Sequence, residues 1–111
     1  MAQSNTHLDK PWLQHYEPGV PAEIDFEQTC MPEYLDRSAE KFPSKMALNF
    51  QGYEITFAQL NEVVDRFCTV MQNFGIGKGD AVALLLPNVI PCVAAYYATL
   101  RLGAVAVMNN P

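Results

Sequence analysis

One run of the sequence constrains the fold more than any other. Residues 81–100 contain no charged side chain, and this run is long enough for a membrane-spanning helix. Pro87, Asn88 and Pro91 interrupt the run, and a proline inside a helix removes a hydrogen bond and clashes with the preceding turn. We therefore expect a strand, a break and then a helix, and a transmembrane span is the weaker alternative.

The segments on either side of this break form a repeating pattern. Residues 81–86 are continuously apolar, which predicts a strand buried on both faces. Asn88 is placed to cap a helix over residues 89–102, and residues 104–108 predict a second buried strand. This order predicts a parallel β-α-β unit.

One such unit cannot cover both faces of its own sheet. We predict that Leu85 lies in a strand that is buried on both faces. In the isolated chain, however, one apolar edge and one apolar face are expected to stay open. We therefore expect the isolated chain to associate with itself.

The preceding part of the chain predicts two helices and a hairpin. Thr29 is placed to cap a first helix that ends at Pro43. Residues 46–50 and 53–56 alternate like strands, and Gln51 and Gly52 between them suit a two-residue hairpin turn.

The second helix has the clearest start. Thr56 and Gln59 match a capping box, and the apolar residues that follow recur at spacings of three and four. That stripe comprises Phe57, Leu60, Val64, Phe67, Met71 and Phe74. Gly75 is placed to end the helix.

The first part of the sequence differs in character. Residues 1–28 are read as an N-terminal extended arm, and residues 29–111 as an incomplete α/β subdomain. The arm carries Trp12 and Tyr16 among prolines but shows no periodicity of its own. We expect it to pack on its own domain rather than on a membrane or a partner.

Composition excludes several classes of protein. Twelve acidic and seven basic residues give a net charge of -5, which argues against nucleic-acid binding. Three widely spaced cysteines do not form a disulfide framework and fit a reducing cytoplasm. The first thirty residues show no secretory signal.

Candidate chemistry is sparse. His7 and His15 have no partners at metal-ligand spacing, and Cys92 lies in an apolar helix where a small buried side chain is expected. The glycine-rich loop at residues 75–80 leaves a helix and enters a strand, the reverse of a phosphate-binding loop. We interpret its glycines as a helix stop and a turn.

Four blocks of sequence resemble AMP-forming adenylating enzymes in order and spacing. They are EITFAQL (54–60), GIGKGD (75–80), LLLPN (84–88) and GAVAVMNNP (103–111). The arm, with Trp12, Tyr16 and the run 19–21, resembles the start of bacterial long-chain fatty-acid–CoA ligases. Ala81 and Leu102 depart from the family's usual arginine and alanine.

This resemblance implies a fold and an activity. The chain is expected to be the N-terminal fragment of the large domain of a ligase that converts a fatty acid and ATP to acyl-adenylate and then to acyl-CoA. ATP, Mg²⁺ and coenzyme A are implied for the full-length enzyme. The family's catalytic, cofactor-binding and metal-binding motifs lie further along, so none of these residues is expected within residues 1–111 and the chain alone is predicted to be inactive.

Two hypotheses follow. In the first, the chain is part of a cytoplasmic fatty-acid–CoA ligase, with contact to the inner face of the membrane left open. In the second, it is a stand-alone binding or interaction module that reuses the fold. A reading frame that continues past Pro111 into a Ser/Thr/Gly-rich loop favours the first, and a natural stop favours the second.

Overall fold

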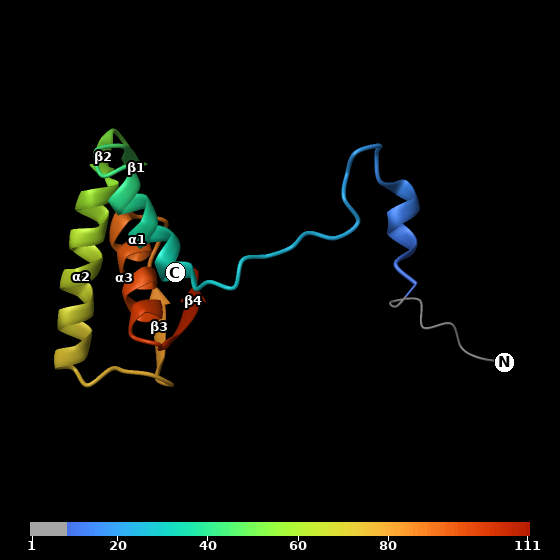
Figure 1. Cartoon of the computed structure of the whole chain (residues 1–111). Coiled ribbons are helices and arrows are strands. Elements are labelled where there is room, and N and C mark those ends of the chain that lie inside the picture. The colour runs from blue at the N-terminus through green and yellow to red at the C-terminus, as the bar shows by residue number, and fades with distance from the viewer. Residues whose placement is uncertain (1–8) are drawn as a thin grey trace.

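The computed structural model describes residues 9–111 and has the predicted α/β class. Two two-stranded sheets and three α-helices form a body, from which an arm extends (Figure 1). The elements are η1 (Pro11–His15), α1 (Met31–Lys41), β1 (Met46–Phe50), β2 (Tyr53–Thr56), α2 (Phe57–Asn73), β3 (Ala81–Leu85), α3 (Ile90–Arg101) and β4 (Val105–Asn109).

The hairpin forms as predicted. β1 and β2 pair antiparallel, and the two turn residues Gln51 and Gly52 have φ values of 51° and 87°. Positive φ at both central residues matches the right-handed twist of the flanking strands. The side-chain oxygen of Asn49 accepts a 3.0 Å hydrogen bond from the Gly52 N–H and closes the turn.

The predicted capping box joins the hairpin directly to α2. The Gln59 N–H donates to the Thr56 hydroxyl at 3.2 Å, and the Gln59 side-chain oxygen accepts from the Thr56 N–H at 2.8 Å. Thr56 is both the last residue of β2 and the N-cap of α2, so no loop separates the two elements. Of the predicted stripe, Leu60, Val64 and Met71 are buried, but Phe74 lies beyond the helix end and is exposed.

Two helix starts differ by one residue from the prediction. α1 and α3 are capped by Cys30 and Val89, not by Thr29 and Asn88, and neither cap supplies a side-chain hydrogen bond. In both helices a proline stands in the first turn, where its fixed φ is already helical. The position of the proline therefore decides the start, and not the nearest good capping side chain.

Helix α3 lies in the middle of the body. β3 and β4 pair in parallel from Ala81↔Val105 to Leu85↔Asn109, and α3 packs on one face of this sheet. α1 and α2 pack on the other side of α3 (Figure 1). The helix is consequently buried through a series of mostly small residues: Cys92, Ala94, Ala95, Ala98 and Thr99.

The prediction that β3 is buried on both faces is wrong. Leu84 faces α3 and is 5% exposed, whereas Leu85 faces the other way and is 62% exposed. Val105 and Val107 on β4 are also exposed, at 54% and 43%. Among residues 9–111 no helix covers this second face, because a single β-α-β unit contributes one helix to one side.

Arg101 ties the three helices together at the last turn of α3. Its guanidinium donates to the Asp65 carboxylate on α2 at 2.7 Å and also to Asn61 on α2 and Asp36 on α1. The Arg101 side chain is only 16% exposed, whereas both aspartates are more than half exposed. A cation at a helix C-terminus also interacts favourably with the helix dipole.

The arm does not pack on the body, contrary to the prediction. Trp12, Tyr16 and Val20 are 43–52% exposed, and Figure 1 shows the arm running away from the helices. Arg37 on α1 donates to both carboxylate oxygens of Glu27, at 2.8 and 2.9 Å. This ion pair joins the base of the arm to α1.

The two neighbouring leucines of β3 provide a test of the sheet assignment. Leu84→Ala is expected to lower the free energy of unfolding by about 2–5 kcal/mol, because it leaves a cavity against α3. Leu85→Ala is expected to cost less than about 1 kcal/mol, because the side chain is already largely solvated. Urea unfolding followed by circular dichroism in dilute solution measures both, and equal losses would contradict the assignment.

The Arg101 contacts predict a second difference. Arg101→Ala is expected to lower the free energy of unfolding by about 1–2 kcal/mol, since three charged or polar acceptors lose a shared donor but remain in contact with water. Arg66→Ala is the matched control, because Arg66 pairs with Glu62 at 2.5 Å on one exposed helix face. A change within about 0.5 kcal/mol is expected there. An equal effect of the two substitutions would contradict the role of Arg101 in joining the three helices.

Candidate functional site

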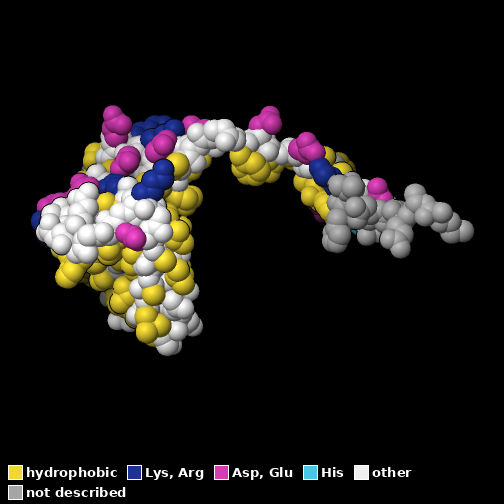
Figure 2. All heavy atoms as spheres, turned by 90° about the horizontal axis from the view of Figure 1, so that it is seen from below, with side chains coloured by type: hydrophobic (Ala, Val, Ile, Leu, Met, Phe, Trp, Pro, Cys, Tyr) yellow, Lys and Arg dark blue, Asp and Glu magenta, His cyan; other side chains and the backbone are white. Residues whose placement is uncertain are grey.

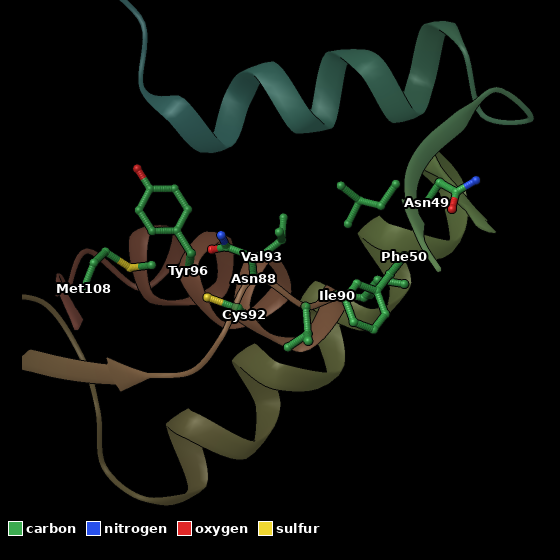
Figure 3. A pocket seen from close by; sticks show the side chains of 10 residues that line it. Asn49, Phe50, Asn88, Ile90, Cys92, Val93, Tyr96 and Met108 are labelled. Carbon is green, nitrogen blue, oxygen red and sulfur yellow. The ribbon is translucent and has the colours of Figure 1, made fainter. Parts of the chain in front are cut away.

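The main cavity of the described chain lies between the hairpin and the start of α3. Its volume is about 420 Å³, within the range of small-molecule sites. Figure 3 shows Phe50 and Ile90 toward one end and Tyr96 and Met108 toward the other. The lining residues are Leu48, Asn49, Phe50, Asn88, Val89, Ile90, Cys92, Val93, Tyr96 and Met108.

The topology explains the position of this pocket. Asn88 follows the carboxyl end of β3, and Met108 lies near the carboxyl end of β4. In open α/β sheets, ligands bind outside the carboxyl ends of parallel strands. The pocket is therefore at the edge of the sheet where a binding site is expected.

The lining of the pocket suits an apolar ligand group. None of the described residues that line it is an Asp, Glu, His, Lys or Arg. The Asn49 amide is already engaged, because it accepts from the Gly52 N–H and donates to Glu54 at 3.0 Å. The pocket therefore offers a mostly apolar wall with few polar groups.

A smaller pocket adjoins it on the side of α1. Its volume is about 200 Å³, and Leu48 and Val93 line both cavities. Tyr34 and Leu35 on α1 form its opposite wall. The two pockets thus share a wall in which the hairpin meets α3.

The amides of the glycine-rich loop donate hydrogen bonds within the protein, as expected for a helix stop and a turn. The Gly77 N–H donates to the Asp80 carboxylate at 2.8 Å, and the Gly79 N–H donates to the Gly103 carbonyl at 3.1 Å. Gly75, at φ 80°, follows the C-cap of α2, and the Ile76 N–H donates back to the Met71 carbonyl. These amides are consequently not free to cradle a phosphate, and a carboxylate stands among them.

The remaining candidates lie apart from one another. His15 is exposed in the arm, and Cys92 is buried against the pocket, as expected for a small apolar side chain. Burial raises the pKa of the Cys68 thiol, whose sulfur contacts the Ala98 carbonyl at 3.7 Å. His7 lies outside the described residues.

Within residues 9–111, no three His, Cys, Asp or Glu side chains are grouped to hold a metal ion. No helix in the same range has the length and apolar character needed to cross a membrane.

The pocket itself is not evident from the sequence. The sequence predicts a capping role for Asn88 and only strand positions for Phe50 and Met108, whereas all three line the cavity. The available signal was positional, since a polar residue directly after a buried parallel strand lies at the ligand-binding edge.

The sequence is similar to known proteins over most of its length. The pattern of the AMP-binding enzyme family matches residues 35–111. A long-chain-fatty-acid–CoA ligase of Bacillus subtilis (strain 168) is 35% identical over 102 residues, or 92% of this chain and 18% of that protein. The chain thus spans about a fifth of the length of the curated relatives it matches.

Solved structures agree with the sequence match. A Mycobacterium tuberculosis fatty acyl CoA synthetase gives a TM-score of 0.70 at 35% identity, over 73% of this chain and 16% of that one. An artificially fused adenylation–PCP di-domain from Klebsiella oxytoca, NpsA-ThdA, gives 0.73 at 29% identity, over 77% and 16%. The hairpin and the β-α-β unit match the N-terminal part of these adenylating enzymes, and the chain belongs to the AMP-binding enzyme family.

Proposed function

We propose that this chain is the N-terminal part of a long-chain fatty-acid–CoA ligase. The ligase activates a fatty acid with ATP to an acyl-adenylate and then transfers the acyl group to coenzyme A. The observation that carries this proposal is the extent of the match to the Bacillus subtilis ligase. That match covers 102 of the 111 residues and therefore includes most of the arm. The general family pattern, in contrast, begins at residue 35.

The proposed contribution of these residues is structural. Phosphoryl chemistry on ATP needs cations placed against the charge that develops on the transferring oxygens. The described pocket has no cationic or acidic lining residue, and the glycine-rich loop uses its amides internally. The groups that bind ATP, Mg²⁺ and coenzyme A are therefore proposed to lie beyond Pro111, and the chain supplies the first strands and helices of the domain.

The cellular setting proposed for the ligase is the cytoplasm. Its substrates ATP and coenzyme A are cytoplasmic metabolites, and the three cysteines Cys30, Cys68 and Cys92 are free thiols in the structure. Free thiols fit a reducing compartment.

A stand-alone binding module is the second candidate. The observation that favours it is the arm, which runs away from the body in Figure 1 and leaves Trp12 and Tyr16 45% and 43% exposed. A protein that ends at Pro111 and captures a partner through these residues would fit the same structure without any ligase activity.

Activity measurements separate the two candidates. The 111-residue chain alone is expected to show no fatty-acid-dependent exchange of pyrophosphate into ATP, because the phosphate-binding and metal-binding groups of the reaction are proposed to lie outside it. A protein expressed from a reading frame that continues past Pro111 is expected to form acyl-CoA from a long-chain fatty acid, ATP and coenzyme A.

Three other outcomes would lead to different conclusions. Amino-acid-dependent exchange by the longer protein, with none for fatty acids, would assign it to a different adenylating enzyme. Exchange by the 111-residue chain itself would overturn the structural role, and a natural stop codon after Pro111 would favour the binding module.

A further inference from the structure

We draw no further inference here: the strongest candidate, the exposed apolar patch on the flank of the body below the arm (Figure 2), carries none because nothing in the structure shows what covers it.

Discussion

Close packing between α2 and α3 is the contact on which the rest of the body depends. Ala94, Ala95 and Ala98 project so little from α3 that α2 and the parallel sheet both approach it closely. Buried alanines gain little transfer energy individually, but they place larger residues of the neighbouring elements, such as Val64 and Leu84, in dense contact. Fixed in this way, α3 presents its first turn to the main pocket and its last turn, with Arg101, to α1 and α2.

Much of the fold could be predicted from local sequence because its determinants are short in range. Thr56 and Gln59 fix the start of α2 through hydrogen bonds three residues apart, and Gln51 and Gly52 fix the hairpin through their own backbone angles. The exposure of Leu85 and of the arm could not be predicted in the same way. An apolar run indicates that a segment is suited to burial, but what covers each face depends on elements elsewhere in the chain.

The pocket was beyond local prediction for a related reason. Its walls come from β1, the start of α3 and the end of β4, which are not neighbours in the sequence and meet only after the fold has formed. The sequence did predict correctly that the glycine-rich loop is structural, since the order of helix, loop and strand alone decides where free N–H groups point.

The absence of a loop between β2 and α2 has a mechanical consequence. Because Thr56 belongs to both elements and the capping box holds the junction, the hairpin and α2 are joined directly, without a loop. The hairpin carries Phe50 in the pocket wall, and α2 lies along α3. The packing of α2 on α3 therefore helps to place Phe50 in the wall of the pocket.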